Sequence, residues 1–435
     1  MTGNIYIFLI SMMVLFISID VKAESVWTAP FNSTENGSIS TGSQLSLDDV
    51  FQLVASANPA LKSFEYQLIA AESNLKQAGL WANPELGVEF EEVGWDAPGF
   101  KEFEFSISLA QDIEFFGQRG ARKNIAQAQI DNAELQVKLL TFDLYLETKQ
   151  RYYALAHAQQ SVRLSYKSVE LAREIVENTN YRLERGASMQ SEFLLAQLEE
   201  QRALLALDQA KLEVNAAEAI LVSLWNGKVL GMKVTTGAES DFNNLFNRIA
   251  LLSNGTDSTR DIIQKRSELE ILRAEKAMAI AEARPAVTLS GGFKRLEVNN
   301  SKSFIFGVSL PIPLFNRNQG KQKSLDAQLR SLEYDLERSR TETISNINSH
   351  AIHFKNLVHS HGTLDSLLLP TAEKAYRTLQ QAYEAGRVPF TQLLEAERAL
   401  NDLNFEHNDL LLMIQEQIIA MESLTGITMH VTKEN

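Results

Sequence analysis

Four histidines stand close together in the second half of the sequence and have the chemistry to bind a metal ion, because imidazole nitrogens are common zinc and copper ligands. These are His350, His353, His359 and His361. On an α-helix each residue is rotated by about 100° from the one before. His350 and His361 then share a face, His353 lies about 60° away, and His359 points almost opposite. The rings cannot converge on one ion, so we predict a solvated helix face and no metal site.

Neighbouring carboxylates offer a second possible chemistry, general acid and base catalysis. The pairs are Glu199 with Glu200 and Glu395 with Glu397. On helices such pairs are more often exposed charges than catalytic groups, and no nucleophile elbow, phosphate loop or HExxH motif accompanies them. The absence of cysteine excludes disulfides, thiolate metal sites, a cysteine nucleophile and a lipid anchor on cysteine. We therefore predict that the protein is not an enzyme and uses no cofactor.

Composition narrows the class of protein further. The 435 residues are 45% hydrophobic, which is ample for packed cores, and carry a formal net charge of -14. Because phosphate binding needs a basic surface, this charge argues against a nucleic-acid partner.

The amino terminus resembles an export signal. Residues 5–19 are almost wholly apolar, and Val21 and Ala23 place small residues three and one before a cut ahead of Glu24. A membrane anchor is the alternative, but the apolar run is shorter than the ~20 residues a spanning helix needs. No later segment has 18 uninterrupted apolar residues. If the mature chain spans a membrane, it must do so as strands.

Two strand hairpins are predicted from alternating polar and apolar residues. The alternating segments are residues 85–91, 102–109, 286–294 and 303–310. They give one hairpin at about 84–110 and a second at about 285–312. Shorter helices should precede the hairpins, with Ser46 as an N-cap, Pro59 in a first helical turn, and a helix over 261–283.

Two helical hairpins of unusual length are also predicted. Their helices are residues 118–185, 189–225, 319–385 and 390–424. The first would be about 100 Å long at 1.5 Å per residue, and helices in globular domains average only about 11 or 12 residues. Gly186 and Gly386 mark the breaks at the two hairpin tips. Pro370 should kink the third of these helices.

The two halves of the chain match each other, which indicates an internal duplication. The matched features are residues 103–109 (FEFSISL) with 304–310 (FIFGVSL), Gly120 with Gly320, and Gly186 with Gly386. The predicted organisation is a signal peptide at 1–23, a flexible leader at 24–44, a first repeat at 45–226, an equatorial linker at 227–258, a second repeat at 259–426 and a tail at 427–435.

The strand hairpins impose a requirement on assembly. Strands of 8 to 10 residues are long enough to cross an outer membrane, but four cannot close a barrel. Because unpaired strand edges are not tolerated in lipid, several copies must share one barrel. The apolar faces would meet lipid and the polar faces the lumen. The predicted lumen residues are Glu85, Glu89, Glu102 and Glu104, which either form an ordinary polar interior or favour cationic cargo.

The mature chain resembles the TolC-like outer-membrane efflux factors over essentially its whole length. The resemblance rests on the duplicated order of hairpins, on residues 383–397 (YEAGRVPFTQLLEAE), and on the weaker match at 183–194 (LERGASMQSEFL). Within the family, residues 310–320 (LPIPLFNRNQG) and 111–122 (QDIEFFGQRGAR) resemble the branch that serves heavy-metal exporters of the Czc and Cus type.

The resemblance implies a mainly α fold with a membrane β-barrel portion. Three copies would form a 12-stranded barrel above an α-barrel of long helical hairpins, anchored in outer-membrane lipid. The homotrimer would meet a periplasmic adaptor and an inner-membrane pump of the RND type. The implied docking tips are Arg185, Gly186, Ala187, Gly386, Arg387 and Val388. The implied entrance constriction is Gln392 and Glu395, six and nine residues after the second tip glycine, with Glu192 as the acidic counterpart in the first repeat.

These observations favour the outer-membrane channel of a tripartite efflux pump, which conducts substrate passively from an inner-membrane pump and periplasmic adaptor to the outside, with metal cations as one candidate substrate. One alternative is the same kind of duct serving type I protein secretion or drug efflux. Another is a periplasmic coiled-coil scaffold without a pore. In a pump of this kind the inner-membrane component selects the cargo and the duct follows.

Overall fold

The computed structural model describes residues 44–91, 104–227, 231–234, 242, 259–297 and 299–428. The predicted signal peptide, nearly all of the leader, Glu102, most of the equatorial linker and the last residues of the tail lie outside this part of the chain.

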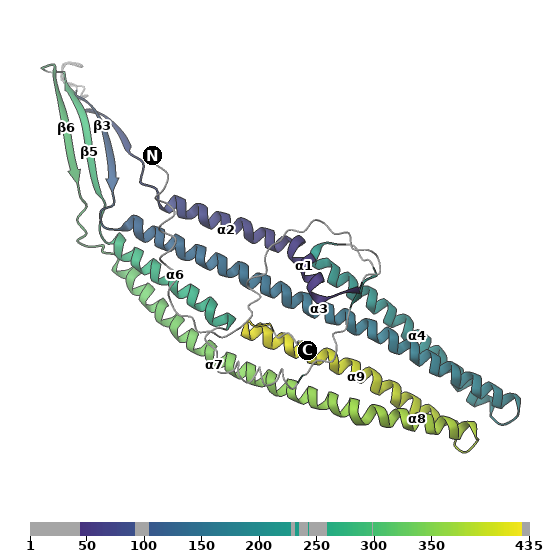
Figure 1. Ribbon diagram of the computed structural model, residues 1–435. Coiled ribbons are helices and arrows are strands. Elements are labelled where there is room, and N and C mark those ends of the chain that lie inside the picture. Colours follow the sequence, from purple (N-terminus) through teal and green to yellow (C-terminus); the bar gives the residue numbers. More distant parts are fainter. Residues whose placement is uncertain are drawn as a thin grey trace, which may run out of the picture. The chain divides into compact units, whose positions relative to one another are not determined.

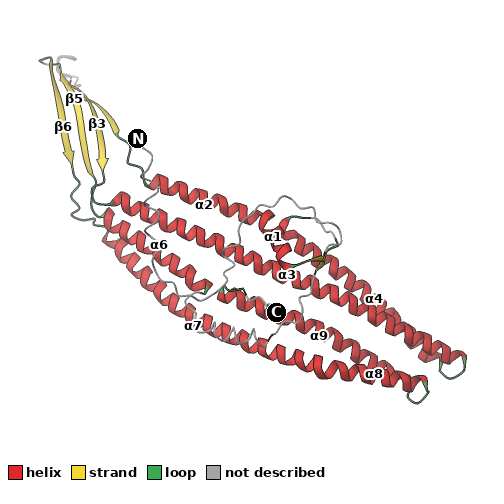
Figure 2. Ribbon diagram, in the orientation of Figure 1, coloured by secondary structure: helices red, strands yellow, loops and turns green. Residues whose placement is uncertain are grey.

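Eight helices, six strands and two short helical turns make up most of the described chain (Figures 1 and 2). They are β1 (Gln44–Leu45), α1 (Leu47–Ala57), α2 (Pro59–Ala78), β2 (Glu85–Glu91), β3 (Glu104–Ile113), α3 (Gln118–Glu184), α4 (Gln190–Val222), a 3-10 turn (Ser223–Trp225), β4 (Lys233–Val234), α6 (Arg260–Glu282), β5 (Val287–Leu296), β6 (Ser301–Ser309), α7 (Gln319–Thr363), a π-helical turn (Leu364–Leu368), α8 (Leu369–Glu384) and α9 (Phe390–Thr425).

Local sequence signals set the start of the helical part. Ser46 caps α1 through a capping box, since its hydroxyl accepts from the Asp49 backbone N–H at 3.2 Å and its own N–H donates to the Asp49 carboxylate at 3.0 Å. Asn58 caps α2, and Pro59 occupies the first helical position. Both predicted helix starts are confirmed. Gln44, which we placed in the leader, instead pairs in parallel with Lys233 in a two-stranded sheet that the sequence did not indicate.

The long helices lie side by side and carry the hydrophobic core. α3 packs against α4, α2, α6 and α9, while α9 also packs against α7 and α8. One buried cluster joins α1, α3 and α4 around Tyr152 and Leu155. A second surrounds Tyr383 and Phe390 near the ends of α8 and α9, and a third joins α7 to α9 around Phe354. The cores therefore follow the helix contacts, as expected for amphipathic stripes.

The strands form one antiparallel sheet in the order β2-β3-β5-β6. The two hairpins, which are about 200 residues apart in the sequence, meet where β3 pairs with β5, from Glu104 opposite Leu296 to Ile113 opposite Val287. Gly292 permits this pairing, because a Cβ there would lie 2.7 Å from the Ile107 carbonyl oxygen.

Pro370, for which we predicted a kink, follows a π-helical turn. In this turn the Leu369 N–H donates to the Leu364 carbonyl, five residues back. Proline has no N–H with which to continue the α-helical ladder, and π turns are a common way for a helix to absorb such an irregularity. α7 and α8 are therefore separate segments of one long arm.

Candidate membrane sheet and docking tips

One face of the four-stranded sheet is apolar and open to the surroundings. It includes Leu86 and Phe90 of β2 and Phe304, Phe306 and Val308 of β6, all of them exposed. The side chain of Phe306 is 85% exposed. An exposed apolar patch of this extent is typical of a surface that contacts lipid or protein.

The opposite face is acidic. Register places Glu85, Glu89 and Glu104, three of the predicted lumen residues, on this face together with Glu91 and Lys294. Lys294 contacts Glu104 and lies 3.1 Å from a Glu91 carboxylate oxygen. Among the described strand residues this face carries four glutamates and Asp112 against one lysine, a net charge of -4. Sequence reasoning missed Lys294, although its alternation with Phe293 was visible.

The predicted docking tips are two copies of one helix-ending motif. Gly186 and Gly386 both adopt left-handed backbone, with φ of +68° and +69°. After each glycine the next backbone N–H reaches five residues back, from Ala187 to the Arg182 carbonyl and from Arg387 to the Ala382 carbonyl, each at 2.8 Å. This is the Schellman motif, in which glycine avoids the steric cost of positive φ.

Most of the predicted tip side chains are open to contact. Arg185, Ala187 and Arg387 are exposed, whereas Val388 is half-buried against the Tyr383 cluster. Val388 therefore positions the tip rather than offering a free docking side chain.

Arg182 links the two tips to each other. Its guanidinium donates to the Tyr383 carbonyl at 2.5 Å, to the Glu384 carbonyl at 3.0 Å and to the Ala187 carbonyl at 3.1 Å. It also lies over the Tyr383 ring, 4.6 Å from the centroid. Sequence reasoning missed this residue, and the available signal was a break in the duplication, since the second repeat has Ala382 at the matching position.

The predicted constriction residues lie beyond the tips on two helices. Gln392 and Glu395 are exposed on α9, and Glu192 is half-buried in the first turn of α4. The Glu192 carboxylate accepts a hydrogen bond from the Ser188 hydroxyl.

Comparison with known proteins identifies the family. The profile of the outer membrane efflux protein family matches residues 50–227 and 251–427, once over each repeat. The chain belongs to the outer membrane efflux protein family. The predicted resemblance is thereby confirmed, and the protein is an outer-membrane channel that extends into the periplasm.

Two relatives of this efflux protein carry names that describe metal resistance. It is similar to the cobalt-zinc-cadmium resistance protein CzcC of Cupriavidus metallidurans, with 25% identity over 361 residues that cover 82% of this chain and 84% of CzcC. It is also 23% identical over 296 residues to the nickel-cobalt-cadmium resistance protein NccC of Alcaligenes xylosoxydans, with 64% of each chain covered.

Solved channel structures share the fold of the efflux protein. The transmembrane channel CusC matches with a TM-score of 0.71 at 15% identity, covering 90% of this chain and 95% of CusC. The outer membrane protein VceC of Vibrio cholerae matches with a TM-score of 0.70 at 15% identity, covering 88% and 96%. The family and these neighbours are non-enzymatic transporters, and channels of the family are trimers that work with adaptor and inner-membrane pump partners. Among the described helices none is both long and apolar enough to span a membrane.

A buried carboxylate in the efflux protein corrects one of our predictions. Glu397, which we took for an exposed helix charge, is only 4% exposed. It accepts from the Asn401 side-chain amide at 3.1 Å. Burial raises the pKa of the Glu397 carboxyl to about 7, and the neighbouring Glu199 carboxylate adds to this shift. Glu199 itself pairs with Arg398 and, at 2.8 Å, with Arg202.

The histidines of the efflux protein do not form one solvated face either. His353 and His359 are exposed, but His361 is buried and stacks on His407 of α9 with ring centroids 4.7 Å apart. His350 is half-buried and bonds Gln417 at 2.9 Å. The predicted solvated face is wrong because α9 covers this side of α7. Across the described residues, no three histidine, aspartate or glutamate side chains are grouped so as to hold a metal ion.

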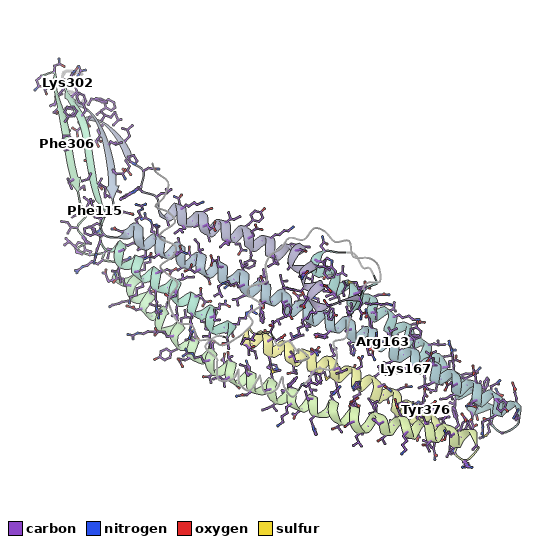
Figure 3. The ribbon with its side chains drawn as sticks, viewed as in Figure 1. Phe115, Arg163, Lys167, Lys302, Phe306 and Tyr376 are labelled. Atoms are coloured by element: carbon purple, nitrogen blue, oxygen red, sulfur yellow. The ribbon has the colours of Figure 1, made fainter. Side chains whose placement is uncertain are left out.

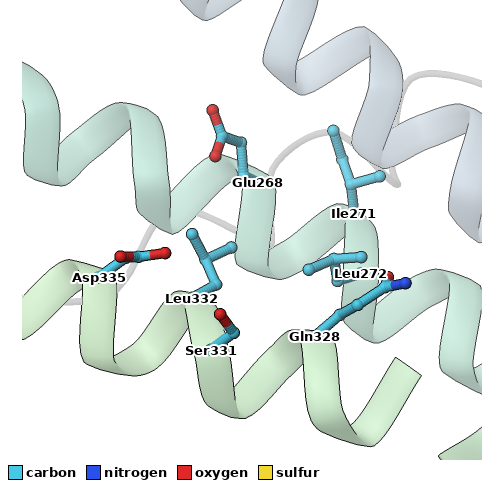
Figure 4. Close-up of a pocket in the computed structure, with 7 residues that line it drawn as sticks. All are labelled: Glu268, Ile271, Leu272, Gln328, Ser331, Leu332 and Asp335. Carbon is cyan, nitrogen blue, oxygen red and sulfur yellow. The ribbon is translucent and has the colours of Figure 1, made fainter. Parts of the chain in front are cut away.

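A hollow of about 430 Å³ lies between α6 and α7 of the efflux protein (Figure 4). It is lined by the apolar side chains of Ile271, Leu272 and Leu332 and by the polar side chains of Glu268, Gln328, Ser331 and Asp335. Small-molecule sites combine an apolar pocket with convergent polar groups. This open hollow lacks such convergence and is better described as an uncovered helix face.

Proposed function

We propose that the protein is the outer-membrane duct of a tripartite efflux pump and that it acts as a homotrimer whose sheets close one 12-stranded barrel. The observation that carries the proposal is the four-stranded sheet, in which β2 and β6 are edge strands and one face is apolar and exposed. An open sheet edge leaves backbone N–H and C=O groups without partners in lipid. Pairing β2 of one protomer with β6 of the next would satisfy both edges and leave a lumen lined by the acidic face.

Uncovered helix faces support the same trimer. α4 exposes Leu198, Leu205 and Leu212, which recur every seven residues, a spacing typical of a seam between packed helices. α7 exposes Tyr334 and Ile344 on the other arm, and the hollow between α6 and α7 is open as well. Side-by-side packing of protomers around an axis would cover these surfaces and produce the α-barrel.

We infer that the cargo consists of divalent metal cations delivered by an adaptor and an inner-membrane pump of the RND type. Two relatives are named for resistance to cobalt, zinc, nickel and cadmium, and the acidic sheet face would raise the local concentration of cations. The tips at Gly186 and Gly386 would dock the adaptor, and Gln392, Glu395 and Glu192 would narrow the entrance.

The absence of cysteine allows a direct test of barrel closure. Val88→Cys on β2 would be combined with Phe304→Cys, Phe306→Cys or Val308→Cys on β6, and each double variant would be oxidised in outer membranes. We expect at least one pair to give covalent trimers on a denaturing gel. Ile107→Cys with Phe293→Cys, which are paired within one protomer, should give monomers only. Monomers from every β2–β6 pair, with no conductance in a planar bilayer, would refute the duct.

The cargo is tested separately in the native host. Deletion of the gene should increase sensitivity to cobalt, zinc, nickel or cadmium and leave sensitivity to dyes and antibiotics unchanged. The opposite pattern would refute metal transport while leaving the duct intact.

A further inference from the structure

Exposed aromatic side chains gather where the sheet meets the helices. Strand pairing places the termini Ile113, Val287 and Ser309 at the same end of the sheet. We define the collar as residues 113–123 and 310–323, where the chain leaves β3 and β6 at this end, together with Trp81, which precedes β2. Figure 3 shows Phe115 in the collar, Phe306 along the sheet and Lys302 at its far end.

The collar repeats with the duplication. Phe115 and Phe315 are 200 residues apart, like the matched glycines, and are 63% and 90% exposed. Leu314 and Trp81 beside them are also more than half exposed. Both repeats thus place a large apolar side chain in the open at the same level of the molecule, continuous with the apolar sheet face.

The collar is also basic, in contrast to the rest of the chain. Its two segments contain six arginines and lysines and a single acid, Glu114, so that they carry a net charge of +5 in a chain of net charge -14. Arg119 lies over the Trp81 ring, 4.9 Å from its centroid, and Arg122 is paired with Glu114. Lys321 is paired with Glu282 of α6 at 3.2 Å, and the remaining cations, Lys123, Arg317 and Lys323, are exposed.

We propose that the collar lies in the headgroup layer of the periplasm-facing leaflet of the outer membrane, where its cations contact the phosphates of anionic phospholipids. Tryptophan collects at membrane interfaces because its ring is apolar while its N–H is polar, and Trp81 occupies this position beside the exposed apolar side chains of the collar. Lysine and arginine clusters beside them bind anionic lipid surfaces. The proposal rests on the proposed function, since it requires the sheet to lie in the membrane, and it supplies an anchor for a chain without a lipidated cysteine.

Spin labels test the depth of the collar, because the chain has no cysteine of its own. Phe115→Cys and Phe315→Cys would each carry a nitroxide in the intact protein, reconstituted in vesicles of phosphatidylcholine and phosphatidylglycerol. Collision rates with oxygen and with a water-soluble nickel chelate report depth. Phe306→Cys serves as the reference for the hydrocarbon, and Ala187→Cys, exposed at the tip at the far end of α3 from the sheet, as the reference for water.

We expect the labels at 115 and 315 to report an interfacial depth, between the hydrocarbon and water. Nickel accessibility as high as in bulk water would overturn the proposal. So would labels that are immobile and shielded from both reagents, since a neighbouring protomer would then cover the collar. A label at 306 that is not in hydrocarbon would instead refute the proposed function itself.

The charge component has its own measurement. Spin-labelled phosphatidylglycerol should be held at the protein several-fold more than phosphatidylcholine, and Lys123→Gln, Arg317→Gln and Lys323→Gln together should reduce that ratio to near one. A matched triple variant of exposed helix cations, Arg163→Gln, Lys167→Gln and Arg338→Gln, should leave it unchanged. Equal ratios in the wild type and the collar variant would overturn the assignment of anionic lipid.

Discussion

Replacement of Arg182 by alanine should loosen the connection between the two docking tips without unfolding the protein. Arg182 makes three charged hydrogen bonds to carbonyl groups, two of which belong to α8 and one to its own tip, and it stacks on Tyr383. The α8 carbonyls are at the negative end of the helix dipole, which favours a cation. Only the two bonds to α8 and the stacking on Tyr383 join the two tips. Because the side chain is half-exposed, we count each of these bonds at about 1 kcal/mol and the stacking at about 0.5 to 1 kcal/mol, so that the linkage is worth about 2 to 3 kcal/mol.

Hydrogen exchange in the assembled protein measures this linkage directly. A loss of about 2 to 3 kcal/mol corresponds to about 30- to 150-fold faster exchange in peptides that cover residues 181–192 and 381–392, with the remaining helices unchanged. Arg182→Lys should fall between the wild type and the alanine variant, because lysine keeps the charge but loses the planar fork of donors. Arg185→Ala is the matched control, since Arg185 stacks on Tyr181 of its own helix. If Arg182→Ala exchanged no faster than Arg185→Ala, the linkage would not exist in solution.

Three further outcomes are expected. Lys149 lies 2.8 Å from the Glu422 carboxylate, whose side chain is 0% exposed. Lys149→Met should lower the thermal midpoint by several degrees, because removal of this cation from a buried ion pair costs about 3 to 5 kcal/mol. Adding Glu422→Met should recover most of the loss, and a double variant no better than the single one would contradict this. For Glu397 the folded pKa of about 7 exceeds its ordinary 4.5, so the folded state keeps a proton that the unfolded state loses between these values, and stability should fall as pH rises through that window. Glu397→Gln should therefore raise the midpoint at pH 8 and change it little at pH 4.5, and equal shifts at both values would exclude the linkage. Gly386→Ala should destabilise its tip by about 1 kcal/mol through the left-handed backbone alone, seen as faster local exchange; unchanged exchange would contradict it.

The sequence was informative wherever a repeated pattern determines the element. Alternation in residues 85–91 gave β2 with its bounds, because a strand with one lipid-facing side must alternate. The uninterrupted helical period after Gln118 gave α3, which ends at Glu184 just before the tip. Glycine positions gave both tips, since only glycine adopts the left-handed helix end without strain.

The sequence was least informative about which helix covers which. Glu397 and His361 have the polarity of surface residues, and only the packing of α9 against α3, α7 and α8 buries them. Contacts between residues more than 200 positions apart, such as Arg182 with Tyr383, leave no periodic trace in one sequence. The pairing of β1 with β4 involves two residues in each strand, too few for alternation to be detected.

The two repeats diverge where the tips meet, and this divergence bears on how the entrance opens. Within one protomer, Arg182 at the end of α3 bridges to the last carbonyls of α8. In the proposed trimer the matching junction lies between protomers, where the end of α8 faces the first-repeat hairpin of the next copy. The residue that corresponds to Arg182 there is Ala382, and a methyl group has no donor for the carbonyls of Leu183 and Glu184. We therefore expect the paired tips of one protomer to move as a unit and the entrance to widen at the junctions between protomers. Two spin labels, at Ala187 and Arg387, would then keep a narrow distance distribution within a protomer and a broad one between protomers, and equal widths would contradict the argument.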